Sequence, residues 1–358
     1  QANLTAGTYG QLAGASLTVG QLARAALSAA QADGTLTTSL AATLNGLSAA
    51  PGAPAVPLSR LFSLAAYAYQ PIGSALTSSA LVGNLDLFTL LDDAAAIAAG
   101  SGPLTIAPSV AGISAVSVQA AVGQPAQSSP FGTFSPVGTG VQTAQVRLQV
   151  TLTLANVAAG ALLNQTLTVP VYVEAAKGIA TLSAISCGRN PRTDAVVTVG
   201  GTTGTATAAI GTVSSGGLAN FAATPTLQPA TILSTNVAGV VKPVAVTASG
   251  TTTVLPGKGT LSFTQAQIAQ TPPVVQTISA NQVLVSPALY NAVQFGSLPS
   301  TISAADLLKA LKPILGDGTN PGVLDTIVSS ALGAFGIRLG AMDVTVPGVR
   351  CGVPVLVQ

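Results

Sequence analysis

Apolar and polar residues alternate through the middle of the chain. Between residues 144 and 154, Ala, Val and Leu alternate with Gln, Arg and Thr, which predicts a strand with one buried and one solvated face. Residues 167–173 alternate in the same way, and Pro170 within them favours an edge strand or a bulge. Turns rich in Gly and Ser separate further strand candidates at 180–186, 195–199, 205–210, 244–248 and 259–263. We therefore expect an antiparallel, sandwich-like or barrel-like β core over residues 104–287.

Helical spacing replaces this alternation in the first hundred residues. Thr18 and Gln21 match a capping box that would open a helix over 19–30. Three prolines between residues 51 and 57 predict a stiff, extended linker, and apolar spacing predicts two more helices at 58–68 and 79–99. Residues 1–100 are therefore expected to form a mainly helical region. The adjacent acids at 92 and 93 point about 100° apart on a helix, so we interpret them as part of a solvated face.

A helical pair is also predicted near the other end, over residues 303–336. Ser303 and Asp306 match a capping box, and Pro313 should kink or end the helix that follows. Pro321 suits the first position of a second helix. The stretch 338–358 alternates again and predicts a last strand that returns to the sheet. The expected fold is thus α+β, with a central antiparallel sheet flanked by helices.

Composition narrows the possible functions. Only 6% of the residues are charged and the chain has no His, which excludes Ser-His-Asp and Cys-His catalysis and imidazole metal sites. The formal net charge of +2, with scattered Lys and Arg, is unlike that of a nucleic-acid-binding protein. A mean hydropathy of +0.61 suggests a membrane protein, but no run of about 20 apolar residues is present. We predict no enzyme, and no catalytic, cofactor-binding, metal-ligating or small-molecule site.

Two polar clusters are candidate binding sites. Arg189, Arg192 and Asp194 follow Cys187 in a probable loop that could hold a small anion. Residues 317–320 resemble the start of a calcium loop, but the positions of the glycine and the terminal Glu are wrong. We interpret both clusters as surface turns.

The two cysteines, Cys187 and Cys351, are too far apart in sequence for a zinc or redox motif. They are either two buried free thiols or one disulfide, and the Gly that follows each Cys after a strand-like segment favours pairing. A disulfide would indicate an oxidising, extracytoplasmic compartment.

Several blocks of the chain resemble TadG-like proteins, which are associated with Tad/Flp pilus assembly in proteobacteria. The clearest are residues 336–346 (GIRLGAMDVTV) and 349–357 (VRCGVPVLV), with similar blocks at 17–22, 143–148 and 171–176. The resemblance implies an extracytoplasmic protein linked to pilus or cell-surface assembly and supports the Cys187–Cys351 disulfide. It also implies an N-terminal membrane anchor, which we do not expect within this chain.

A surface of Thr, Ser, Gln, Gly and Ala with few charges favours ordered association through strand edges. The sequence therefore predicts a non-enzymatic, extracytoplasmic structural or assembly protein, with itself or other surface or pilus assembly proteins as partners. The alternative is a self-polymerising subunit of an extracellular filament, sheath or surface layer. A polysaccharide-binding module is disfavoured, because the chain has five Tyr, eight Phe and no Trp to stack on sugars.

Overall fold

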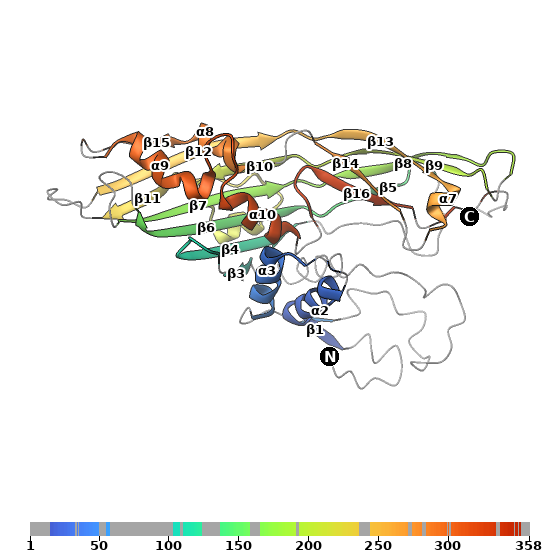
Figure 1. Cartoon of the computed structure of the whole chain (residues 1–358), viewed down its shortest axis with the longest axis horizontal. Coiled ribbons are helices and arrows are strands. Elements are labelled where there is room, and N and C mark those ends of the chain that lie inside the picture. Colours follow the sequence, from blue (N-terminus) through green and yellow to red (C-terminus); the bar gives the residue numbers. More distant parts are fainter. Residues whose placement is uncertain are drawn as a thin grey trace.

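A computed structural model shows an elongated α+β molecule built on antiparallel sheets (Figure 1). It describes residues 15–32, 34, 36–49, 55–57, 103–107, 110–123, 137–157, 165–190, 193–235, 244–270, 274–280, 284–298, 300, 302–333, 337–346, 348, 349 and 351. The α+β class and the sheet-rich core predicted from the sequence are confirmed.

The larger sheet has eight strands, which pair antiparallel. Its strands are β3 (Leu104–Ile106), β4 (Ala115–Val122), β6 (Val146–Val157), β7 (Gln165–Ala175), β10 (Ala206–Ile210), β11 (Ala230–Thr235), β12 (Val244–Val254) and β15 (Gln294–Phe295). β10 and β11 pair with successive halves of β12, and both contact β7. The two short strands therefore lie end to end between β12 and β7.

β7 is a central strand, because it lies between β6 and β10, and the edge position predicted from Pro170 is wrong. The carbonyl of Pro170 accepts a hydrogen bond from the N–H of Gly211, just beyond the end of β10. In a strand, the N–H and the C=O of one residue point to the same side. The position of the missing N–H of Pro170 therefore points toward β10, just beyond the last residue pair of the β7–β10 ladder. A central strand tolerates the proline for that reason.

The smaller sheet has four strands and continues the larger one. Its strands are β5 (Gly140–Gln142), β8 (Ile179–Ser186), β9 (Val196–Thr202) and β13 (Lys258–Thr264). β5 runs into β6, β7 into β8, β9 into β10 and β12 into β13, and the strand order is the same on both sides. Four long strands thus cross the molecule, and each is interrupted at the same line (Figure 1).

Threonine and glycine carry hydrogen bonding across this line. The N–H of Thr143 donates to the carbonyl of Gly178 (3.0 Å), and the N–H of Gly178 donates to Thr143 Oγ1 (2.8 Å). Thr203 and Gly257 repeat the arrangement, with distances of 2.9 and 2.8 Å. The hydroxyl replaces a backbone carbonyl that has turned away, so the broken strands keep their neighbours.

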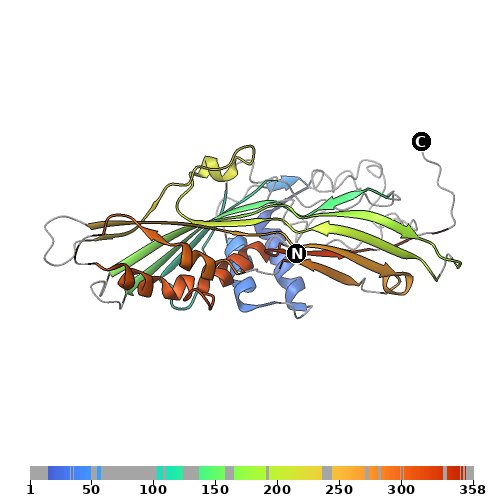
Figure 2. The same ribbon diagram turned by 90° about the horizontal axis from the view of Figure 1, so that it is seen from above.

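Three helices cover one face of the larger sheet: α8 (Ser286–Ala292), α9 (Ala304–Leu315) and α10 (Val323–Gly333) (Figures 1 and 2). Their apolar sides enclose the main core with the inward residues of β6 and β7. The predicted pair over 303–336 is confirmed. Ser303 caps α9 by accepting a hydrogen bond from the N–H of Asp306, and the helix passes through Pro313 to end at Leu315.

The carboxylate of Asp325, in the first turn of α10, joins two of these helices. It accepts hydrogen bonds from the N–H groups of Val285 and Ser286 and from the hydroxyl of Ser286. These donors lie at the start of α8, where N–H groups lack partners within the helix. The pairing fixes the two helix N-termini side by side.

The N-terminal helices are α2 (Val19–Ala32) and α3 (Thr38–Ala49), and they lie beside the middle of the molecule (Figure 1). The capping box is confirmed, since Thr18 and Gln21 exchange side-chain-to-backbone hydrogen bonds of 2.9 and 3.2 Å. β1 (Ser16–Thr18) pairs with β2 (Ala55–Pro57). The predicted helices at 58–68 and 79–99, with Asp92 and Asp93, lie outside the described residues. None of the helices described is long and apolar enough to cross a membrane.

The last strand, β16 (Ala341–Thr345), pairs with β14 (Val275–Ser279) in a two-stranded ribbon. Met342, Val344 and Ile278 of this ribbon pack on Phe263 and Val197 of the smaller sheet. Of the strand predicted over 338–358, the structure shows residues 341–345, which return to the β core by packing on a sheet face; residues 352–358 lie outside the described residues.

We predict that Gly204→Ala destabilises the fold by roughly 3 kcal/mol or more, because an added Cβ would lie 1.7 Å from the carbonyl oxygen of Ala176. The measurement is the free energy of unfolding in urea. Gly216→Ala is the matched control: nothing lies within 4 Å of its Cβ position in the short helix α6 (Ser215–Ala219), so its stability should change by at most about 1 kcal/mol. Equal effects in the two variants would contradict the tight packing at the line of breaks.

Candidate functional site

The polar side of β6 is buried, which corrects the solvated face predicted for residues 144–154. Arg147 is 3% exposed and Gln149 is 6% exposed. The segment 211–229, which connects β10 to β11 and contains α6, covers them on the sheet face opposite the helices (Figure 2). We call this segment the cap. Alternation indicated the two faces of the strand correctly, but it could not show that distant residues cover the polar one.

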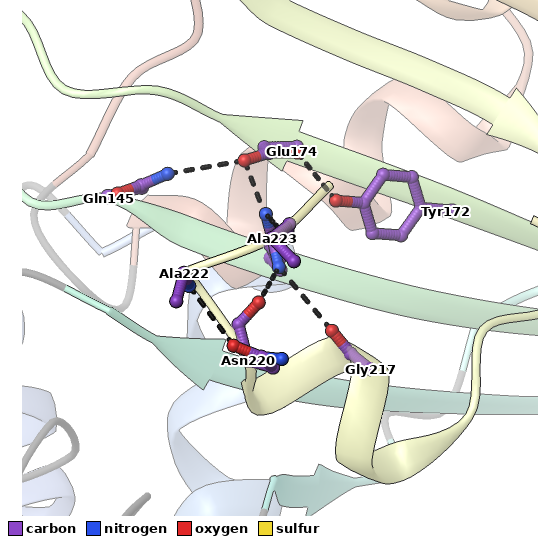
Figure 3. A network of polar contacts seen from close by, with 8 residues as sticks. Gln145, Tyr172, Glu174, Gly217, Asn220, Ala222 and Ala223 are labelled. Atoms are coloured by element: carbon purple, nitrogen blue, oxygen red, sulfur yellow. Dashed lines mark hydrogen bonds and ion pairs between the residues drawn. The ribbon is translucent and has the colours of Figure 1, made fainter. Parts of the chain in front are cut away.

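Arg147 holds the cap on the sheet, and Figure 3 labels the cap residues that it contacts, Gly217, Asn220 and Ala223. Its guanidinium donates to the carbonyls of Asn220 (2.7 Å) and Ala223 (3.1 Å), with a longer contact of 3.4 Å to Gly217. The carbon of the guanidinium also lies 4.5 Å from the ring centre of Phe221, a cation–π distance. Because α6 ends at Ala219, the positive charge also suits the carbonyls around the helix C-terminus.

Glu174, on the neighbouring strand β7, balances this charge. Its Oε1 lies 3.2 Å from Arg147 Nε and accepts a hydrogen bond from Gln145 Nε2 (3.2 Å), while its Oε2 accepts the hydroxyl of Tyr172 (2.7 Å). Burial, followed by the hydrogen bond to Glu174, raises the pKa of Tyr172 far above its ordinary value. Tyr172 is therefore neutral, and both carboxylate oxygens of Glu174 are engaged.

Gln149 closes the start of the cap. Its Nε2 donates to the carbonyl of Gly211 (3.0 Å), and its Oε1 accepts the N–H of Val213 (3.0 Å). Leu218 of α6 packs on Ala121 and Tyr172 beneath the cap. The polar groups of this cluster are thus engaged in contacts that hold the cap on the sheet.

The two weaker clusters are turns. The carboxylate of Asp194 accepts the hydroxyl of Thr193 (2.7 Å) and the N–H of Asn190 (3.0 Å), which lowers its pKa. Arg192 lies outside the described residues, and no contact here joins Arg189 to Asp194 in an ion pair.

Asp317 likewise turns its carboxylate inward. It accepts hydrogen bonds from the N–H groups of Asn320 (2.8 Å) and Thr319 (3.3 Å), and Lys312 Nζ lies 3.3 Å away. These hydrogen bonds, those from Asn320 first, hold the pKa of Asp317 well below its ordinary value. Within the described part of the chain, no group of three His, Cys, Asp or Glu side chains could hold a metal ion.

Cys187 and Cys351 form a disulfide, as the sequence favoured, with a Cα–Cα distance of 5.6 Å. Cys187 follows β8, and Cys351 follows β16 by six residues. The bond therefore attaches the C-terminal segment to the outer end of the smaller sheet. A disulfide of this kind is typical of proteins that fold in an oxidising compartment.

The smaller sheet presents an open face and an open edge. The ribbon of β14 and β16 covers one face, while the other, through Ser183, Ser186, Thr260, Ser262 and Thr264, exposes hydroxyl side chains. A shallow hollow of about 450 Å³ lies on this open face, between Lys177, Thr181 and Thr202. Its lining contains no acid and no aromatic side chain. This face and the adjoining edge strand β13 are the candidate functional surface.

No family model, curated protein or solved structure matches the chain.

Replacing Arg147 with Met should destabilise the protein by about 3–5 kcal/mol, because Glu174 and three cap carbonyls would lose a buried cation. Arg338→Met is the control, since Arg338 pairs with Asp343 while both side chains are about half exposed, and its loss should cost less than about 1 kcal/mol. Unfolding in urea gives both values. A loss of similar size in the two variants would show that the cap is not held through Arg147.

The disulfide prediction uses the double variant Cys187→Ser/Cys351→Ser. Because the bond spans a sequence separation of 164 residues, its removal should lower the free energy of unfolding by up to about 5 kcal/mol in the chain-entropy model. A reductant should destabilise the wild type to the level of this variant and leave the variant unchanged. Alkylation of two free thiols in the folded, unreduced protein would refute the pairing.

Proposed function

We propose that this protein is a non-enzymatic, extracytoplasmic component of a pilus or another cell-surface structure. The open face and edge of the smaller sheet carry the proposal. They combine a polar surface, a low charge density and backbone groups that have no backbone partner among the described residues, which are features of surfaces that bind other proteins by shape and backbone hydrogen bonding.

The polar clusters support a structural role. The buried charge of Arg147 and the partly buried charge of Glu174 hold the cap, Asp325 holds α8, and Asp317 and Asp194 close turns. Each is already engaged by the chain itself. The disulfide and the resemblance of residues 336–346 and 349–357 to TadG-like proteins support an extracytoplasmic place at the cell surface.

A self-polymerising subunit of a filament, sheath or surface layer is the second candidate. It is favoured by the low charge, 12 basic and 10 acidic residues in 358, which leaves little electrostatic repulsion between copies. Other surface or pilus assembly proteins are the partners expected under the first candidate.

Fractionation of the producing cells tests the compartment and the function together. We expect the chain outside the cytoplasm, with Cys187 and Cys351 oxidised, and we expect it to be captured with pilus or envelope proteins after crosslinking. A reduced protein in the cytoplasmic fraction would refute the proposal.

Negative-stain electron microscopy and light scattering of the purified chain separate the two candidates. Regular filaments or sheets at high concentration would establish the polymer. Discrete particles of one or a few copies would support an assembly component. Repeating both measurements with the Cys187→Ser/Cys351→Ser variant shows whether association requires the disulfide-fixed C-terminal segment.

A further inference from the structure

β13 is one of the two edge strands of the smaller sheet, opposite β5, and forms its upper margin in Figure 1. It pairs with β9 without a register shift, from Lys258 opposite Thr202 to Thr264 opposite Val196. Gly257 and Gln265, on either side of β13, bond through their backbones to Thr203 and Ala195. In an antiparallel ladder the direction of the backbone groups alternates, so the odd-numbered residues of β13 face β9.

The even-numbered residues of β13 therefore turn their N–H and C=O groups outward. Among the described residues, the carbonyl of Ser262 is reached by the side chain of Gln276 (2.8 Å), and the N–H of Thr264 is capped by Gln267 (2.9 Å). In the part of the chain that the structure describes, no backbone group pairs with the N–H or C=O of Lys258 or Thr260, or with the N–H of Ser262. The strand thus offers donors and acceptors in alternation.

The usual protection of an edge strand is weak here. Natural edges are blunted by prolines, bulges or several charges. β13 has no proline and no bulge, and Lys258, at its first residue, is its only charged residue. Next to the strand, Leu255 is 75% exposed, the most exposed large apolar side chain described. An open, regular edge of this kind is a template for pairing with another strand.

We infer that β13 docks a second copy of this chain, strand to strand and antiparallel, about a two-fold axis through Thr260. This inference rests on the proposed structural role and names the contact between copies. In this register Thr260 faces the partner's Thr260, and Lys258 faces the partner's Ser262. Each of these residue pairs joins outward-facing groups, which an antiparallel pairing requires. The two smaller sheets become one continuous sheet.

The chemistry of the edge favours a copy of itself over another partner. A two-fold pairing joins the N–H and C=O of Thr260 to the same groups of the partner's Thr260, and the N–H of Ser262 to the C=O of the partner's Lys258. The carbonyl of Ser262, which already accepts Gln276, has a second lone pair for the N–H of the partner's Lys258. The two Lys258 residues lie four positions apart along the paired strands, about 14 Å, which is beyond the Debye length at physiological salt. The same register brings Leu255 toward the first residues of the partner's α7 (Gln265–Ile268), where its side chain would be shielded from water. An extended segment of a different protein would not need this symmetry.

Thr260→Cys in the full chain tests the geometry directly. Opposed residues in a hydrogen-bonded antiparallel pair have Cα atoms about 5.5 Å apart, within the range of a disulfide. Under mild oxidation we expect a covalent dimer through position 260, formed at least tenfold faster than with Thr231→Cys on β11, which is also exposed. Peptide mapping confirms the linkage and shows that Cys187–Cys351 is intact. Equal rates for the two variants would overturn the inference.

Thr260→Lys tests the same contact without a new thiol. It places two lysines opposite each other, so the dissociation constant from sedimentation should rise at least tenfold, while Thr231→Lys should leave it unchanged. If the wild type associates but neither Thr260 variant behaves as expected, another surface joins the copies, and the structural role stands without this contact. A wild type that stays monomeric at high concentration also overturns the inference, whereas only the cell fractionation and capture decide the proposed function.

Discussion

The two sheets depend on the line at which four long strands are interrupted together. An interruption in a strand normally exposes backbone groups and frees its neighbours, yet here Thr143 and Thr203 each supply both a backbone N–H and a side-chain oxygen to a facing glycine. Each such hydrogen bond is worth about 1 kcal/mol, but an unmade one would leave a polar group buried and unpaired. The strand order is therefore kept across the line, and both sheets have defined faces.

That arrangement decides which faces are covered. On the larger sheet, the helices bury the apolar face. The cap covers the polar face and is held there by the hydrogen bonds and the ion pair of Arg147, Glu174 and Gln149. On the smaller sheet, one face receives the ribbon of β14 and β16, and the other remains open to solvent. Arg147, Glu174 and Asp325 thus bind the chain to itself, and the open face of the smaller sheet carries hydroxyl side chains together with Lys177 and Ile179.

Much of this fold could be predicted from the sequence where the signal is local. The capping boxes at Thr18 and Ser303 and the alternation around Val150 depend on residues within one turn or one strand, and the elements they predict are present. The burial of Arg147 could not be predicted, because its partners at Asn220 and Ala223 lie more than 70 positions away. The edge position predicted from Pro170 was wrong for a related reason. The β10 ladder that its missing N–H would have joined ends at Ile210, and only the tertiary structure shows this.

Among candidate functional features, the disulfide was favoured from the flanking sequence, whereas the open edge at β13 was not indicated. Its strand looked like any other candidate, since a sequence shows which residues can be strands but not which strand lacks a neighbour. The shared line of breaks was equally hidden, because the threonines and glycines that form it are scattered among 38 glycines and many threonines. Only the pairing of distant strands gives these common residues a specific position.

The bond between Cys187 and Cys351 also determines how the molecule would bear tension. The pair β14–β16, pulled from the end of β16, would open one hydrogen bond after another, as a zipper does. Because Cys351 is bonded to the end of β8, a load applied beyond residue 351 passes into β8 and along the axis of the strand that continues as β7. Strands loaded along their axes resist in shear, with many hydrogen bonds strained at once. The covalent link would therefore turn a weak mechanical direction into a strong one.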